Sequence, residues 1–240
     1  MAAGKKAGKK SQASNDFLEP LAPTSVSATN VGTGRAFNNG SATVTFSLPA
    51  LSPAATSFTV TSSPGGFTAT GASSPLTVTG LQSNTAYTFT ATATNAAGTS
   101  AASSASASIT ATTVPATPSA PTVTTQVNQD NVSWSAPANG GSAITGYTWA
   151  SSDAKGATVG SGTISVAVTQ EGGTAQTYTV YATNANGNSL TSAASNSVTT
   201  TPPFFPPFFP PFFPFFPPFF PPFFPPYFAP PTFSGAMAFF

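Results

Sequence analysis

The sequence predicts an all-β chain made of two antiparallel β-sandwiches in tandem, which lie between an N-terminal arm and an extended C-terminal tract. Residues 21–113 and 119–201 contain short runs in which apolar residues alternate with threonine or serine, the period of strands with one wet face. A segment recurs, since residues 91–110 resemble residues 180–199. Charged residues make up only 5% of the chain, which argues against long solvated helices.

The N-terminal arm, residues 1–20, carries four of the six basic residues, at Lys5, Lys6, Lys9 and Lys10. A secretory signal would continue into an apolar stretch of about 7–15 residues. Ser, Gln, Asn and Asp follow instead, so we expect a disordered, solvated arm without an export signal. Because no aromatic residues separate the lysines and the net charge is +1, we expect no specific nucleic-acid partner.

The first sandwich is expected at residues 21–113. Its runs place apolar side chains on one face of each strand, and the two sheets bury these faces against each other. The inward positions are Val44, Phe46 and Leu48, then Phe58 and Val60, Leu76 and Val78, and finally Tyr87, Phe89, Ala91 and Ala93.

A proline-rich segment that begins at Val114 interrupts the pattern, and we read residues 114–118 as a short stiff linker. The second sandwich is expected at residues 119–201. Its inward positions are Val132 and Trp134, Ile144 and Tyr147, Ile164, Val166 and Val168, and Tyr178 and Val180.

The recurring segment contains the pattern A-T-N-A-x-G-x-S at Ala93–Ser100 and at Ala182–Ser189. A strand that ends in Asn and Gly before another strand predicts a hairpin, because both residues accept positive φ at low cost. Two copies of the segment predict two domains of the same kind.

At these residues the chain resembles tandem fibronectin type III domains of the Thr- and Ala-rich kind found in bacterial surface proteins and phage virions. The resemblance implies an immunoglobulin-like sandwich in which Tyr87 is a tyrosine-corner residue whose hydroxyl bonds to nearby backbone. Trp134 resembles the core tryptophan of the family, and Phe46 stands at the comparable place in the first domain. The second domain departs from the pattern: Gln176 occupies the tyrosine-corner position, Tyr178 follows on the same face, and Gln170 replaces a leucine. The structural core is therefore expected to include Phe46, Tyr87, Trp134 and Tyr178.

The C-terminal tract, residues 202–240, is a Pro-Pro-Phe-Phe repeat broken once at Pro214. Proline excludes a helix or a central strand and favours polyproline II, in which about three residues per turn spread the rings around the backbone. We expect such an apolar segment to assemble with copies of itself, three being the preferred number, or to anchor the chain to other proteins; the alternative is a disordered, adhesive tail. The candidate assembly residues are Phe204, Phe205, Phe208, Phe209, Phe212, Phe213, Phe215, Phe216, Phe219, Phe220, Phe223, Phe224, Tyr227 and Phe228.

The sequence contains few residues that could act in catalysis or bind a metal. The chain has no His and no Cys, and the three acidic residues inside the sandwiches, Asp130, Asp153 and Glu171, are far apart in the sequence, so we expect no enzyme, no cofactor and no metal site. Asp153 and Lys155 are placed to form a surface ion pair worth at most about 1 kcal/mol. The segment Asn139–Ser142 is expected to be a turn.

Three aromatic residues, Tyr147, Trp149 and Tyr181, are candidate contacts for host-surface glycans, because ring faces stack on sugars. The competing interpretation places Tyr147 and Trp149, which share one side of a strand, in the core.

These observations favour a phage structural protein, located in the virion, that displays two sandwiches as a spacer or weak host-surface adhesin and is attached through the Phe-Pro tract. One alternative is a bacterial cell-surface or secreted adhesin, which would be extracellular. Another is a carbohydrate-binding accessory module. No transmembrane segment is expected, because prolines interrupt the apolar tract.

Overall fold

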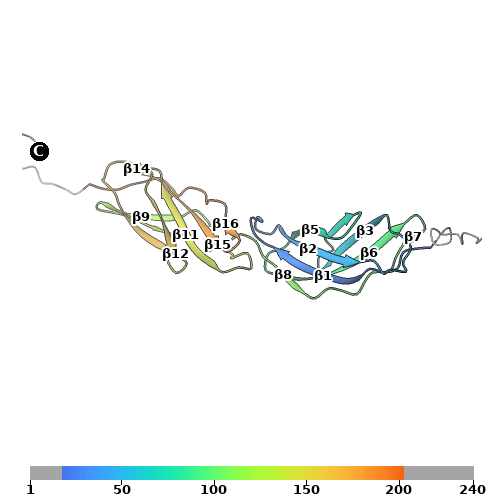
Figure 1. The fold of residues 1–240 in the computed structure, drawn as a ribbon. Coiled ribbons are helices and arrows are strands. Elements are labelled where there is room, and N and C mark those ends of the chain that lie inside the picture. The colour runs from blue at the N-terminus through green and yellow to red at the C-terminus, as the bar shows by residue number, and fades with distance from the viewer. Residues whose placement is uncertain (1–17, 203–240) are drawn as a thin grey trace, which may run out of the picture. The chain divides into compact units, whose positions relative to one another are not determined.

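A computed structural model describes residues 18–202. These residues are all-β, as the alternating pattern predicts, and they contain no helix long and apolar enough to cross a membrane. The basic residues of the arm and the Phe-Pro repeat from Pro203 onward lie outside the described residues. Figure 1 shows the strands in two groups, β1–β8 and β9–β17.

The first group builds one sandwich. Its strands are β1 (Thr24–Val31), β2 (Gly40–Ser47), β3 (Ser57–Ser63), β4 (Thr68–Gly71), β5 (Leu76–Leu81), β6 (Thr85–Asn95), β7 (Gly98–Thr99) and β8 (Ile109–Ala111). One sheet has the order β1-β2-β5, and the other has the order β4-β3-β6-β7 with β8 also paired to β6. All these pairings are antiparallel.

The second group repeats this arrangement. Its strands are β9 (Thr122–Gln126), β10 (Gln129–Ser133), β11 (Ile144–Ser151), β12 (Gly156–Gly160), β13 (Ser165–Thr169), β14 (Ala175–Gln176), β15 (Tyr178–Asn184), β16 (Gly187–Asn188) and β17 (Val198–Thr199). The sheets are β13-β10-β9 and β12-β11-β15-β16, with a small β14-β17 pair. Strand order is therefore the same in both sandwiches.

Each sandwich has its own hydrophobic core, built by alternation. In β6, Tyr87, Phe89, Ala91 and Ala93 are buried and the threonines between them are half-buried, as a period of two requires. Two expected inward positions differ. Leu48 follows the end of β2 and is half-buried, and Ile164 precedes β13 and is exposed, because the strands end before these residues can face the core.

An edge of each sandwich is closed by what we call a serine ladder, consisting of Ser100, Ser103 and Ser106 in the first sandwich and Ser189, Ser192 and Ser195 in the second. The backbone N–H of each serine donates to a strand carbonyl, and its hydroxyl oxygen accepts from the N–H of that same strand residue. The strand partners are Ala93, Ala91 and Phe89 of β6, and Ala182, Val180 and Tyr178 of β15. Successive ladder serines are three residues apart in the sequence, whereas their partners on the strand are two residues apart.

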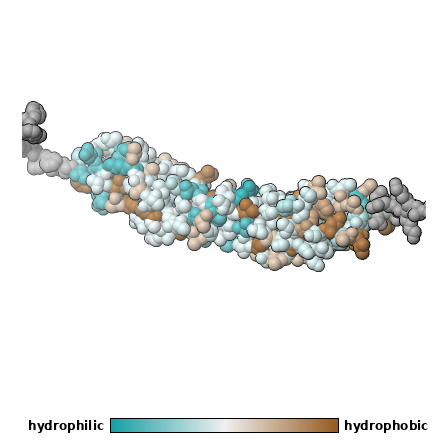
Figure 2. Space-filling view, viewed as in Figure 1, coloured by the Kyte–Doolittle hydropathy of each residue, from teal (hydrophilic) through white to brown (hydrophobic). Residues whose placement is uncertain are grey.

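The surface has few charged residues, as expected from a sequence in which only 5% of residues are charged. Figure 2 shows a surface that is mostly pale, the colour of residues with intermediate hydropathy, with separate hydrophilic and hydrophobic patches.

Candidate functional site: the polar corner and the junction of the sandwiches

The four expected core residues are all buried. Phe46 and Tyr87 lie in the first core, and Trp134 and Tyr178 in the second. Trp134 lies against Tyr147, with ring centroids 5.7 Å apart, and Trp149 lies against Tyr178 at 6.4 Å. Among the described residues, the only buried side-chain polar atoms without a hydrogen-bond partner are the indole nitrogens of Trp134 and Trp149.

The first sandwich has the tyrosine corner that the resemblance implies. The Tyr87 hydroxyl accepts a hydrogen bond from the backbone N–H of Gln82 at 2.9 Å. This bond ties the start of β6 to the chain five residues upstream, so a buried phenol satisfies a backbone donor at the corner.

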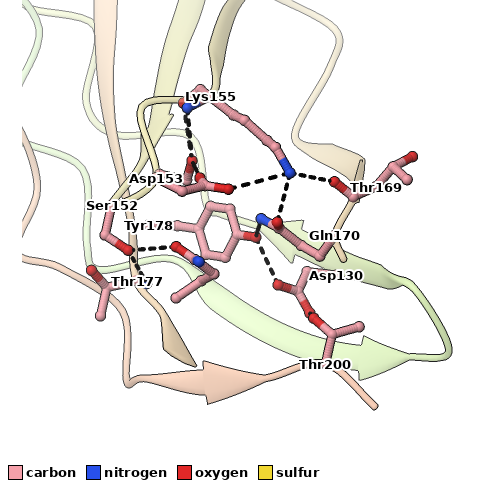
Figure 3. A network of polar contacts seen from close by, with 11 residues as sticks. Asp130, Ser152, Asp153, Lys155, Thr169, Gln170, Thr177, Tyr178 and Thr200 are labelled. Carbon is pink, nitrogen blue, oxygen red and sulfur yellow. Dashed lines mark hydrogen bonds and ion pairs between the residues drawn. The ribbon is translucent and has the colours of Figure 1, made fainter. Parts of the chain in front are cut away.

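The second sandwich builds its corner from side chains, as Figure 3 shows. The Tyr178 hydroxyl donates to Asp130 Oδ2 at 2.7 Å and accepts from Gln170 Nε2 at 2.8 Å. Thr200 donates to the other oxygen, Asp130 Oδ1, at 3.1 Å. Asp130 is completely buried, so these bonds replace the solvation that its carboxylate would otherwise need. Gln176, the residue at the expected tyrosine position, accepts instead from the Ser152 hydroxyl at 2.7 Å.

Lys155 connects this polar corner to the surface. Its Nζ donates to Gln170 Oε1 at 2.7 Å and to the Thr169 carbonyl at 2.8 Å, and lies 3.2 Å from Asp153 Oδ2. The ion pair expected from the sequence is therefore present, and it belongs to a chain of bonds that runs from solvent to Asp130 (Figure 3).

Two pKa shifts follow from this arrangement. Burial, followed by the hydrogen bond to Asp130, raises the pKa of Tyr178 well above its usual range. A hydrogen bond from Ser151, with help from Lys155, lowers the pKa of Asp153. The corner thus holds a neutral phenol inside and an ionised carboxylate outside near pH 7.

The three candidate ligand contacts have different positions. Tyr147 is 1% exposed and Trp149 is 8% exposed, and both belong to the second core, which leaves their ring faces no surface to offer a sugar. Tyr181 lies on the opposite face of β15, where it is half-buried and pairs in register with Thr148. Tyr181 is the one of the three that solvent reaches.

The segment between the sandwiches is held by hydrogen bonds from both sides. In the first sandwich, the Arg35 carbonyl accepts from the N–H of Val114 at 2.9 Å. From the second, Asn184 Nδ2 donates to the carbonyls of Thr113 and Asn139 at 2.9 and 2.8 Å. The two sandwiches also contact each other directly, because the Gly34 N–H of the first donates to the Asn186 carbonyl of the second at 2.8 Å.

Glycines make this close approach feasible. The turn at Asn139–Ser142, expected from its sequence, brings the Gly140 carbonyl to the N–H of Thr113 at 2.8 Å. Gly140 has φ +70, and a Cβ there would lie 2.5 Å from the carbonyl oxygen of Val114, so only glycine fits.

A hollow of about 480 Å³ lies at this junction. It is lined by the β1–β2 loop at Gly34, Ala36 and Phe37, by the connecting segment at Val114, Pro115 and Thr117, and by Gly187, Asn188 and Leu190 at and after β16. We call this hollow the junction groove. None of its lining residues is charged, and one of them, Leu190, is 76% exposed.

Sequence reasoning did not identify Asp130, Thr200, Asn184 or the groove as features of interest. A usable signal existed for one of them: Asn95 and Asn184 occupy equivalent places in the recurring segment. Asn95 Nδ2 donates to the Leu18 carbonyl at 2.8 Å, as Asn184 does to Thr113, so each asparagine holds the segment that enters its own sandwich. The candidate assembly residues, Phe204–Phe228, lie outside the described residues.

The chain was also compared with models of known protein families. Residues 22–110, the first sandwich, match the family model described as fibronectin type III domain. A search of curated proteins found no match.

Among solved structures, the crystal structure of the FN1–FN3 domains of chicken CNTN1 is similar to this chain. It is 18% identical with a TM-score of 0.46, and the alignment covers 76% of this chain and 67% of that chain. A structure of titin kinase and its flanking domains is 29% identical with a TM-score of 0.32, covering 36% of this chain and 17% of that one.

Proposed function

We propose that this chain is a non-enzymatic structural protein of a phage virion, in which two fibronectin type III-like domains, residues 21–113 and 119–201, are displayed as a spacer or weak adhesin. The Phe-Pro tract attaches the chain to the particle or joins it to other copies. Residues 114–118 are the linker of this spacer.

The observation that carries the spacer role is the hydrogen bonding of the junction. The peptide groups of Thr113 and Val114 are bonded by both sandwiches, in place of the water that a freely moving linker would use. A connection of this kind resists independent motion of the domains, which suits a module that must hold a surface at a distance.

The non-enzymatic role is supported by the chain's side-chain inventory. The sequence offers no histidine or thiol to act as base or nucleophile. Within residues 18–202, no group of three or more His, Cys, Asp or Glu is arranged to hold a metal ion.

The virion setting is supported by the resemblance of the domains and by the chemistry of the tract. The tract carries seven aromatic pairs between Phe204 and Phe228, an apolar content that favours burial against other chains, and a particle built from many subunits supplies surfaces for this. Among the candidate aromatics, Tyr181 is the residue through which weak glycan binding would act.

The test is quantitative mass spectrometry on gradient fractions from the source culture after infection or induction, with particles, envelopes and cytosol separated. We expect the chain in the particle fraction at a fixed ratio to a capsid or tail protein. Enrichment in envelopes or medium without particles would contradict the virion role and would favour the bacterial adhesin.

A further inference from the structure

We propose that the junction groove is the receptor for the Phe-Pro tract of a second copy of this chain. The inference rests on the proposed function, because it names the partner that the tract engages. In this proposal residues 202–231 are the ligand, and Phe37 and Leu190 of the groove are its main contacts.

The groove has the chemistry that such a ligand needs. Proline-rich segments bind in aromatic-lined apolar grooves, where rings and pyrrolidines pack flat against each other. Phe37, Pro115 and Leu190 supply apolar surface, and no charge has to be desolvated. Thr117 and Asn188 add hydrogen-bond donors for the carbonyls that polyproline II leaves unpaired.

The size of the groove favours a multivalent arrangement. A volume of about 480 Å³ is that of a pocket for one drug-sized ligand, comparable to a single pair of aromatic rings. The tract carries seven such pairs between Phe204 and Phe228. One tract therefore has binding units for several grooves, whereas its own molecule offers one.

The place at which the chain leaves the second sandwich also favours a groove on another molecule. The chain leaves the second sandwich after β17, which pairs with β14 before the start of β15, whereas the groove is lined by β16, after the end of β15. The seven residues of β15 separate the two places by about 20 Å. Proline-rich segments act as semi-rigid spacers, so we infer that a groove on a second copy is easier for the tract to reach than the groove of its own molecule.

Site-directed photo-crosslinking of the full chain tests the proposal. Leu190 is replaced by p-benzoylphenylalanine in one variant, and Leu51, which is 89% exposed and does not line the groove, is replaced in a matched control. Each variant in ordinary isotopes is mixed with the ¹⁵N-labelled full chain before irradiation, and the cross-linked peptides are identified by mass spectrometry.

We expect position 190 to cross-link to peptides from residues 202–231 of the ¹⁵N-labelled partner, and position 51 to give at most a tenth of that yield. Cross-links from position 190 to its own tract only, or equal yields at the two positions, would overturn the proposal.

Sedimentation equilibrium of the full-length variants Leu190→Glu and Leu51→Glu separates this inference from the proposed function. We expect Leu190→Glu to raise the dissociation constant for self-association about tenfold or more, and Leu51→Glu to leave it unchanged. If the full chain associates and neither substitution weakens it, the groove is excluded while assembly through the tract stands. If the full chain is monomeric at every concentration, both self-assembly and the groove proposal fail, and only attachment to other virion proteins remains.

Discussion

Asp130 shows how a single buried charge shapes the second sandwich. Its carboxylate has no exposed surface, and both oxygens accept hydrogen bonds from neutral hydroxyls, those of Tyr178 and Thr200. Removing one of these hydroxyls leaves one buried carboxyl oxygen without a donor, which costs more than the loss of an ordinary hydrogen bond.

Tyr178→Phe is therefore expected to lower the free energy of unfolding by about 3 kcal/mol. Tyr87→Phe is the matched control in the first sandwich, where the hydroxyl serves only one backbone N–H, and its expected cost is about 1 kcal/mol. Urea unfolding followed by circular dichroism measures both. Equal losses in the two variants would show that Asp130 does not depend on Tyr178.

The raised pKa of Tyr178 predicts a loss of stability in alkali. The folded protein holds this proton more tightly than the unfolded chain, so the contribution is fully present below the unfolded pKa of about 10 and is lost as the pH rises through the folded pKa. Urea midpoints between pH 8 and pH 11 should fall less steeply above pH 10 in Tyr178→Phe than in the wild type. Identical slopes would argue against the shift. Part of the slope is expected to remain in the variant, because burial also raises the pKa of Tyr147.

At the scale of elements, the serine ladders explain why serine recurs every third residue after each A-T-N-A-x-G-x-S pattern. An ordinary strand pairs one residue with one residue, whereas here each serine supplies both a donor and an acceptor to a single strand residue. The ladder hydroxyls also donate to the next carbonyl along their own segment, so few polar groups at this edge lack a partner. A closed edge discourages unwanted strand pairing between molecules.

Ser103→Ala removes the acceptor of a buried N–H, that of Ala91. We expect a loss of about 1–2 kcal/mol and faster hydrogen exchange at the Ala91 amide. Ser104→Ala, at the exposed neighbouring position, is the control and should change neither quantity. Equal exchange rates at Ala91 in the two variants would mean that water replaces the hydroxyl without cost.

At the scale of the whole molecule, hydrogen bonds from Asn184 tie the second sandwich to the connecting segment. Asn184 Nδ2 donates to the backbone carbonyls of Thr113 and Asn139, and the Asn184 side-chain carbonyl accepts from the N–H of Asn186. Asn186 Nδ2 also donates to the Thr113 carbonyl. The bonds from Asn184 to Asn139 and Thr113 span 45 and 71 positions in the sequence, so they form only when the second sandwich is folded around the connecting segment.

Asn184→Ala is expected to loosen the connecting segment and to destabilise the second sandwich by about 1–3 kcal/mol. Limited proteolysis of the full chain should show cleavage within residues 114–118 at a rate several-fold above that of the wild type. Asn95→Ala, the equivalent change in the first sandwich, should leave cleavage at this segment unchanged. If Asn95→Ala has the same effect on residues 114–118, the spacer model of the junction is wrong.

The alternation of apolar and hydroxyl side chains determined the all-β fold and most inward positions, because a period of two depends only on local backbone geometry. Tyr87 and Trp134 are examples, since each is predicted to be buried from its own strand alone.

The tertiary structure decided which long-range partners complete each site. Gln176 stands at the tyrosine-corner position in the sequence, yet Tyr178 builds the corner because Asp130, 48 residues away, lies beside its hydroxyl. Tyr147 and Trp149 had two interpretations until the packing of β11 against the opposite sheet buried them. The junction groove is formed by residues from three separate parts of the chain. A sequence pattern reports the preferences of neighbours along the chain, whereas hydrogen-bond partners and hollows depend on which distant segments folding brings together.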